Sequence, residues 1–110
     1  MKPFDPLKSL LITKIRETVK STEPDAEIIL YGSRARGDFN ENSDYDLLIL
    51  VKKEKLSYAD EQKLRNPLYD IELESGKLIS LTVLPWTVWH TRHKGTQFYE
   101  NIAKEGVRVK

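Results

Sequence analysis

The residues best suited to chemistry in this chain are two acids and a turn, in Asp44-Tyr45-Asp46 and Gly32-Ser33. Asp44 and Asp46 are two positions apart at the start of an apolar run, so in a strand both carboxylates point to one face. Held about 5 Å apart, they repel by about 3 kcal/mol at an effective dielectric of about 20. Such a pair at the start of a buried strand is costly unless a cation bridges it, and Mg²⁺ accepts one or two carboxylates together with substrate phosphates.

Gly32 and Ser33 directly follow an apolar run that ends at Tyr31. A glycine at this point lets backbone N–H groups approach an anion without a Cβ in the way, and Ser33 adds a hydroxyl donor. If a helix begins after Ser33, its N-terminus faces the same anion. Joined to the two aspartates, this phosphate cradle makes a metal–nucleotide site. The alternatives are an ordinary strand-to-loop turn and a polar strand start that faces water.

Other polar residues are more ambiguous. Arg34 and Arg36 are candidates for contacts with triphosphate oxygens, which a guanidinium group matches with two hydrogen bonds, but a solvated loop accounts for them equally well. Asp38 is interpreted as a solvated loop residue. His90 and His93 are three residues apart, and two histidines without a third ligand make a weak case for a metal site. A packed or exposed role is favoured for both histidines.

The elements that position these residues follow from hydrophobic spacing and turn residues. We expect strands at Glu27–Tyr31, Asp44–Val51 and Leu78–Leu84, with an edge strand at Val107–Val109 as a fourth candidate. The second of these strands is apolar on both faces, which is typical of a central strand covered by helices on both sides. Strands that alternate with helices indicate a sheet with helices packed on it, an α/β or α+β domain.

Helix boundaries are predicted from caps and breakers. We expect four helices: one capped by Asp5 with Pro6 at its first position and ending near Lys20, one capped by Ser57 and stopped at Gly76, a short one within Trp86–His93, and one containing Phe98–Ala103 and stopped at Gly106. Pro67 is expected to kink or split the second of these helices near Asn66, because proline removes a backbone donor and clashes with the preceding turn.

Length and composition restrict the class of protein. The chain has 110 residues, which fits one domain over residues 1–110, and its formal net charge is +1. That balance argues against a general polyanion binder, so direct binding of nucleic acid is not expected. There are no cysteines, which excludes disulfides, thiolate zinc sites and a cysteine nucleophile. No apolar run approaches the ~18 residues of a membrane span and the N-terminus does not resemble a secretory signal, so we expect a cytoplasmic protein.

The chain resembles the DNA polymerase β-type nucleotidyltransferase superfamily in its minimal prokaryotic form. The resemblance rests on Gly32-Ser33 followed by Asp44-x-Asp46, with Arg34, Arg36, Gly37, Ser43, the strand Leu47–Leu50 and the tail Asn101-Ile102-x-x-Glu105-Gly106-Val107. It covers nearly the whole chain and implies a mixed sheet of three to four strands flanked by helices. It also implies transfer of a nucleoside monophosphate from an NTP, with ATP expected, to a hydroxyl group.

The same resemblance implies which residues serve the reaction. Asp44 and Asp46 would be the catalytic residues and would hold Mg²⁺, or Mn²⁺ in its place. The triphosphate would be bound by Gly32, Ser33, Arg34, Arg36 and Ser43. Some relatives are antitoxins paired with a small helical HEPN-domain ribonuclease, so a partner of that type is a candidate, and a homodimer is a further possibility. Which NTP is used, and which acceptor, is left open.

The chain departs from the superfamily at one position. A third carboxylate usually lies on a later strand, and the matching strand here, Leu78–Leu84, contains no acid; Ser80 occupies the expected place. A hydroxyl is not a base near pH 7, and loss of a positioned base typically costs about 10²–10⁴-fold in rate. The leading hypothesis is therefore a nucleotidyltransferase of uncertain activity. The second is a regulatory module that binds nucleotide or a partner with weak catalysis or none.

Overall fold

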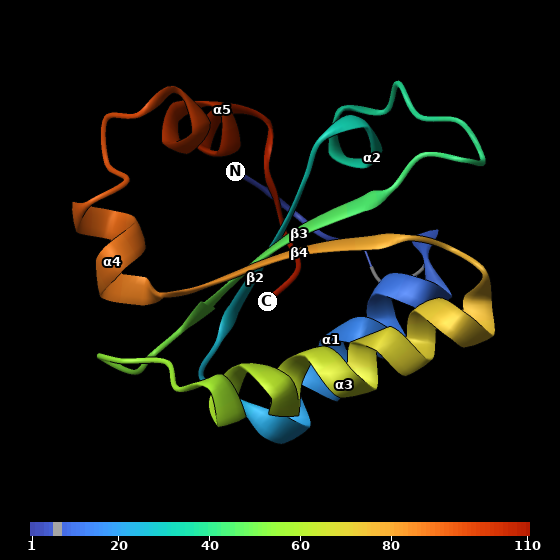
Figure 1. The fold of residues 1–110 in the computed structure, drawn as a ribbon. Helices are drawn as coiled ribbons and strands as arrows, with labels where there is room; N and C mark the ends of the chain where they lie inside the picture. Colours follow the sequence, from blue (N-terminus) through green and yellow to red (C-terminus); the bar gives the residue numbers. More distant parts are fainter. Residues whose placement is uncertain (6–7) are drawn as a thin grey trace.

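The structure is a computed structural model that describes residues 1–5 and 8–110. Its elements run in the order β1 (Lys2–Pro3), α1 (Leu10–Thr22), β2 (Glu27–Tyr31), α2 (Ser33–Arg36), β3 (Tyr45–Val51), α3 (Tyr58–Ser75), β4 (Ile79–Pro85), α4 (Trp86–Thr91), α5 (Gln97–Glu105) and β5 (Val107–Arg108). Figure 1 shows the sheet between two layers, with α1 and α3 on one side and α4 and α5 on the other. The expected α/β class with flanking helices is confirmed.

The sheet is mixed and has the strand order β1-β5-β2-β3-β4 in the described residues. β2 is antiparallel to β3 and β5, whereas β4 is parallel to β3 and β1 is parallel to β5. The expectation of three to four strands was wrong, because the sheet has five. β1 is two residues long and includes a proline, so it leaves no alternating pattern to detect. β5 was expected at an edge, yet it lies between β1 and β2.

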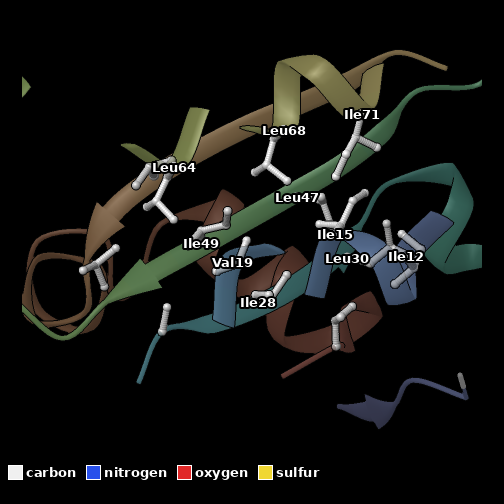
Figure 2. Close-up of a cluster of buried hydrophobic side chains, with 14 residues drawn as sticks. Ile12, Ile15, Val19, Ile28, Leu30, Leu47, Ile49, Leu64, Leu68 and Ile71 are labelled. Atoms are coloured by element: carbon white, nitrogen blue, oxygen red, sulfur yellow. The ribbon is translucent and has the colours of Figure 1, made fainter. Parts of the chain in front are cut away.

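Alternation along the central strand β3 divides the interior into two cores. One core lies under α1 and α3 and contains buried side chains from all five elements around it; Figure 2 labels Ile12, Ile15, Val19, Ile28, Leu30, Leu47, Ile49, Leu64, Leu68 and Ile71. The other core lies under α4 and α5 and contains Ile29, Leu48, Leu50, Trp89 and Ile102. Odd-numbered residues of β3 therefore face α1 and α3, and even-numbered residues, Asp46 included, face the other layer.

The first helix begins later than the sequence suggested. α1 starts at Leu10 and Ser9 is its N-cap, with the Ser9 side chain accepting from the Ile12 N–H at 3.1 Å. The prediction of a cap at Asp5 was therefore wrong, and Pro6 lies outside the described residues. Both Asp5 and Ser9 are good N-cap residues. The buried stripe of α1 begins at Ile12, so capping at Ser9 suffices to place that stripe on the sheet.

The third helix is continuous through its proline. α3 runs from Tyr58 to Ser75 with Pro67 inside it, so the expected split near Asn66 was wrong. A capping box of Ser57 and Asp60 secures its start, and Gly76 closes it at a φ of 71°. Buried residues on both sides of Pro67 hold the two halves against the sheet, which offsets the lost hydrogen bond. No helix among the described residues is long and apolar enough to cross a membrane.

Candidate active site

The candidate site lies where β2 runs into the Gly32 turn. The strand registers place Tyr31 of β2 and Ser80 of β4 as the Cα partners of Asp46 on β3. We call these three residues the Asp46 row. Partners in register on neighbouring strands share a face of the sheet, so the Asp46 row faces the layer of α4 and α5. Asp44 lies just before β3, and its charge acts on the Asp46 carboxylate.

Gly32 is required by a close approach of Asp46. Gly32 has a φ of 74°, a region that favours glycine, and a Cβ built on it would lie 2.2 Å from Asp46 Oδ2. The Asp46 carboxylate therefore packs against the Cα of Gly32. α2 begins at the next residue, Ser33, and no side chain caps this single helical turn. The structure thus brings Gly32 and Asp46 together, and Ser33 is the residue that follows Gly32.

The two aspartates interact electrostatically. Partial burial raises the pKa of Asp46 above its ordinary value of 3.8, the negative charge of Asp44 raises it further, and the Arg36 guanidinium lowers it. The carboxylates are therefore close enough to repel each other, as the sequence pattern predicted. The described residues contain no group of three or more histidine, aspartate or glutamate side chains arranged to hold a metal. A cation at this point would take the two aspartates and further ligands from its substrate or water.

Ser80 lies next to Asp46 at the position where a third carboxylate was expected. It is exposed and belongs to β4, which the register pairs with β3 from Tyr45–Ile79 to Val51–Pro85. A serine hydroxyl is a donor and a neutral acceptor rather than a base near neutral pH. The Asp46 row therefore contains a single carboxylate.

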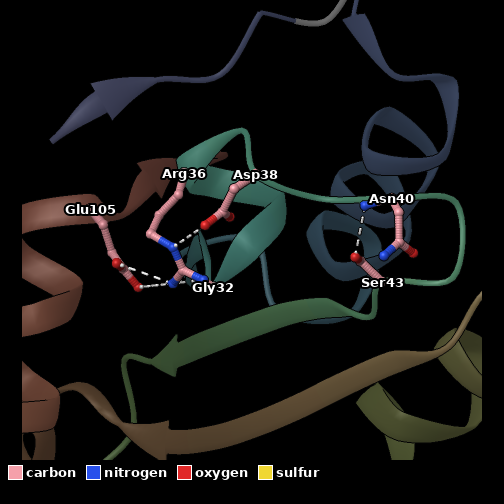
Figure 3. A network of polar contacts seen from close by, with 6 residues as sticks. All are labelled: Gly32, Arg36, Asp38, Asn40, Ser43 and Glu105. Atoms are coloured by element: carbon pink, nitrogen blue, oxygen red, sulfur yellow. Dashed lines mark hydrogen bonds and ion pairs between the residues drawn. The ribbon is translucent and has the colours of Figure 1, made fainter.

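A second acid, Glu105 at the end of α5, binds the Gly32 turn. Its carboxylate accepts from the Gly32 N–H at 3.4 Å and from Arg36 Nη1 at 3.3 Å, while Arg36 Nε donates to Asp38 at 3.3 Å (Figure 3). The hydrogen bonds that Arg36 donates to Asp38 and Glu105 raise the pKa of Arg36. Arg36 is therefore held between two carboxylates, within electrostatic range of Asp46.

Sequence reasoning assigned no such role to Glu105 or Asp38. Glu105 appeared only as part of a tail motif, and Asp38 was interpreted as a solvated loop residue. The available signal was the neighbouring Gly106, where a Cβ would lie 2.5 Å from the Ile102 carbonyl oxygen and 2.9 Å from Ile29 Cγ2. The missing side chain lets the end of α5 press against β2, and this contact carries Glu105 to the Gly32 turn.

Arg34 and Ser43 brace the loop between α2 and β3. Arg34 Nε and Nη2 donate to the Ser43 carbonyl oxygen at 3.2 and 3.1 Å, and its guanidinium lies over the rings of Phe39 and Tyr45. Ser43 Oγ accepts from the Asn40 N–H at 3.0 Å. Both side chains have structural partners here, and their contact with a triphosphate stays a prediction.

The two histidines belong to an aromatic cluster between α4 and α5. His90 Nδ1 lies 3.0 Å from the Tyr99 hydroxyl, and the His93 ring stacks on Trp89 with 5.4 Å between centroids. These contacts match the packed role favoured for them.

Comparison with known protein families gives a consistent picture. The model of the nucleotidyltransferase domain family matches residues 12–109 of this chain. A curated relative from Methanocaldococcus jannaschii is 34% identical over 82 residues, which cover 74% of this chain and 76% of that protein. That relative carries the provisional name of a protein adenylyltransferase.

Two solved structures share the fold. One is a toxin–antitoxin crystal structure with AMP-PNP, which has a TM-score of 0.64 at 21% identity and matches 90% of this chain and 72% of its own. The other is the toxin–antitoxin MntA-HpeT with two aspartate-to-glutamate substitutions, with a TM-score of 0.62 at 18% identity over 90% of this chain and 71% of its own.

The approach of Asp46 to Gly32 can be tested with a matched pair of substitutions. Gly32→Ala and Gly37→Ala both place alanine at a positive φ, which costs about 1–3 kcal/mol, and the cost is higher at Gly32 because its ψ of −160° lies in a region that glycine alone usually occupies. Nothing lies within 4 Å of a Cβ at Gly37, whereas a Cβ at Gly32 meets the Asp46 carboxylate. We expect only Gly32→Ala to move the NMR titration of the Asp46 carboxyl carbon. Equal titration curves in both variants would contradict the contact.

The raised pKa of Asp46 predicts an unusual pH dependence of stability. The folded state holds the Asp46 proton more tightly than the unfolded state does, so this contribution to stability is present below about pH 3.8 and is lost as pH rises through the folded pKa. Asp46→Asn removes the cost of the charge. We expect Asp46→Asn to become more stable than the wild type as pH rises through that window, measured by urea unfolding.

The control is Asp60→Asn, whose effect has the opposite sign. The pKa of Asp60 is lowered, mainly by the Ser57 backbone N–H, so its contribution is present above the unfolded pKa and lost as pH falls through the folded one. Asp60→Asn is therefore expected to be less stable than the wild type near pH 7, with the difference shrinking in acid. If the stability change of both variants varied with pH in the same direction, the charged form of Asp46 would not be disfavoured in the folded state.

Proposed function

This chain belongs to the nucleotidyltransferase domain family, and from that premise we propose that it transfers a nucleoside monophosphate from ATP to a hydroxyl group of a partner protein. The observation that carries the proposal is the repelling pair Asp44 and Asp46 at the Gly32 turn. Asp46 is held against Gly32 although burial and Asp44 both raise its pKa. An arrangement that disfavours its own negative charge suits a site that binds a cation.

Mg²⁺ fits the residues present. Two carboxylates that repel each other, with no third protein ligand among the described residues, suit an ion that completes its shell with substrate phosphates and water. We propose Asp44 and Asp46 as its ligands, with Mn²⁺ as a substitute. When bound, the ion offsets charge that develops on the transferring phosphoryl group.

The protein's own groups orient the nucleotide. In the transfer, the acceptor oxygen bonds to the α-phosphorus, the bond from that phosphorus to the bridging oxygen breaks, and pyrophosphate leaves with its electron pair. We assign the Gly32 N–H, the Arg36 guanidinium and Ser33 to the triphosphate; the first two donors would exchange their present acceptor, the Glu105 carboxylate, for phosphate oxygens. The proton of the acceptor hydroxyl passes to water, because Ser80 offers no base.

The choice of ATP and of a protein acceptor draws on the relatives. The Methanocaldococcus relative is named for protein adenylylation, and the two structural neighbours are toxin–antitoxin proteins, one of them with AMP-PNP. We propose by analogy that this chain modifies a partner in the same kind of pair. A small helical HEPN-type protein is the candidate partner.

A second function is favoured by Ser80. With a hydroxyl where the superfamily usually has a third carboxylate, the domain can act as a regulatory module that binds nucleotide and partner with little transfer. The two functions differ in what the aspartates do. In the enzyme they are needed for the biological effect, and in the module they are not.

Removal of both aspartates tests the enzyme directly. Asp44→Asn with Asp46→Asn should reduce transfer of label from α-labelled ATP to the partner by about 10²–10³-fold or more, because the charges that hold the cation are gone. Asp70→Asn, an exposed residue of α3, serves as the control and should be unaffected. Full biological effect and full partner binding in the double variant would favour the regulatory module.

Addition of the missing acid tests the position of Ser80. Ser80→Asp puts a carboxylate beside Asp46 on an exposed site, so transfer should rise, by at most about 10²–10⁴-fold. Ser21→Asp, an exposed serine of α1, is the control for added charge. Unchanged transfer in a folded Ser80→Asp variant would show that the rate is not limited by a base at this position.

A further inference from the structure

The outer edge of β4 is the most conspicuous unpaired backbone in the described sheet. β4 is the outermost strand there and is paired on one side, with β3. The Tyr45 N–H donates to the Leu78 carbonyl oxygen at 2.9 Å, so in this parallel ladder the even-numbered residues of β4 direct their backbone groups to β3. The odd-numbered residues, Ile79, Leu81 and Val83, direct theirs to the outer edge.

This edge lacks the usual protection. Natural edge strands avoid pairing with other chains through charges, prolines, bulges or short length. From Leu78 to Pro85 the strand contains no charged residue, and it is seven residues long. The two ends of the strand are protected against pairing with another strand, because the Ile79 N–H donates to Glu72 at 2.7 Å and Pro85 has no N–H. The outward-facing backbone N–H and C=O of Leu81, in the middle of the strand, have no such protection among the described residues.

An apolar surface continues from this edge onto α3. Tyr69 and Leu73 of α3 are 57% and 64% exposed, and Leu78 beside β4 is 61% exposed. A shallow hollow of about 190 Å³ lies between the helix and the strand, lined by Arg65, Leu68, Tyr69, Glu72, Ile79 and Leu81. Exposed aromatic and aliphatic groups around unpaired backbone mark an interaction site.

We propose that the β4 edge binds a second copy of this chain, with β4 antiparallel to β4 of the copy about a two-fold axis at Leu81. Outward-facing residues must meet outward-facing residues, so Leu81 pairs with itself and Ile79 pairs with Val83 of the copy. Centring the axis on Val83 instead would bring Leu81 against Pro85, which has no N–H to donate. In the proposed register Glu72 releases the Ile79 N–H to the new strand.

Charge complementarity selects a second copy over an unrelated strand. α3 runs antiparallel to β4, and Leu68 and Tyr69 line the hollow together with Leu81. A two-fold axis through Leu81 therefore passes near Leu68 and Tyr69 of α3. It brings a residue before this point in one copy close to the residue equally far after it in the other copy. Arg65 and Glu72 are such a pair. In the single chain Arg65 donates to Glu61 at 3.2 Å on its own helix; in the dimer each Arg65 would also meet Glu72 of the other copy, while the two Tyr69 rings meet at the hollow. An unrelated strand would satisfy the backbone but not this exchange.

The pairing leaves the candidate active site open. Asp46 and Ser80 are even-numbered and face the layer of α4 and α5, whereas α3 and the hollow lie on the opposite face of the sheet. The dimer would therefore extend one sheet across both copies, with two candidate sites on its other face.

Charge reversal with rescue tests the proposal on the full chain. We expect sedimentation equilibrium to show a wild-type dimer with micromolar dissociation, Arg65→Glu to weaken it about tenfold or more, and Arg65→Glu with Glu72→Lys to restore it. Lys63→Glu, an exposed residue of α3 outside the hollow, should leave the dimer unchanged. Tyr69→Lys, at an exposed position that cannot damage the core, should also weaken it.

The outcomes that would overturn the proposal are distinct. A wild-type chain that stays monomeric at concentrations well above micromolar excludes the dimer. A dimer that Arg65→Glu and Tyr69→Lys leave intact, with native circular dichroism, places the interface elsewhere. If Arg65→Glu abolishes the dimer and the added Glu72→Lys does not restore it, the proposed two-fold register is wrong. A partner protein that displaces the second copy from wild type but not from Tyr69→Lys would show that the edge serves a different chain.

Discussion

The site depends on holding the Asp46 carboxylate against Gly32 while Asp44 repels it. Both burial and this repulsion disfavour the charge of Asp46, so the arrangement persists only because the surrounding structure fixes it. Asp46 is the second residue of β3, and the residues that follow it, Leu47 to Leu50, are completely buried. A rotation of β3 or a shift of its register would expose side chains of both cores. The register of β3 is therefore fixed, and it fixes the position of the Asp46 carboxylate.

The same constraint accounts for the meeting of β2, β3 and the end of α5 at the Gly32 turn. β2 brings Gly32 to Asp46 through its antiparallel register, and Gly106 lets α5 approach β2 closely enough for Glu105 to bind the Gly32 N–H and Arg36. Glu105 and Asp38 together neutralise an arginine that would otherwise be free to move. Because surface ion pairs contribute little to stability on their own, the value of this network lies in orienting Arg36 beside the aspartates.

Local sequence patterns predicted the strands and helices whose residues are close together in the chain. They failed where contacts between distant segments determine the structure. The apolar runs in Glu27–Tyr31 and Leu47–Val51 were sufficient for both central strands, and Ser57 with Gly76 bounded α3. The sequence could not show that β5 lies between β1 and β2, because β5 pairs with residues 105 positions away in β1 and 77 to 79 positions away in β2. Pro67 was misread since propensity describes an isolated helix, whereas α3 is held by the sheet. Glu105 was missed for the same reason as β5: its partners are distant in the chain.

Ser80 and the β4 edge belong to one strand, and this outermost strand is the least constrained of β2, β3 and β4. β2 and β3 have neighbours on both sides, so their side chains are fixed by the sheet, whereas β4 is fixed on one side by β3 and by the helix packed against its face. A third carboxylate at Ser80 would be a third negative charge near Asp44 and Asp46, on a strand with the least support to hold it there. Serine avoids this repulsion. Pairing of the β4 edge with a second copy would supply the missing support from outside, so the stiffness of the Asp46 row would then depend on the interface as well as on the fold.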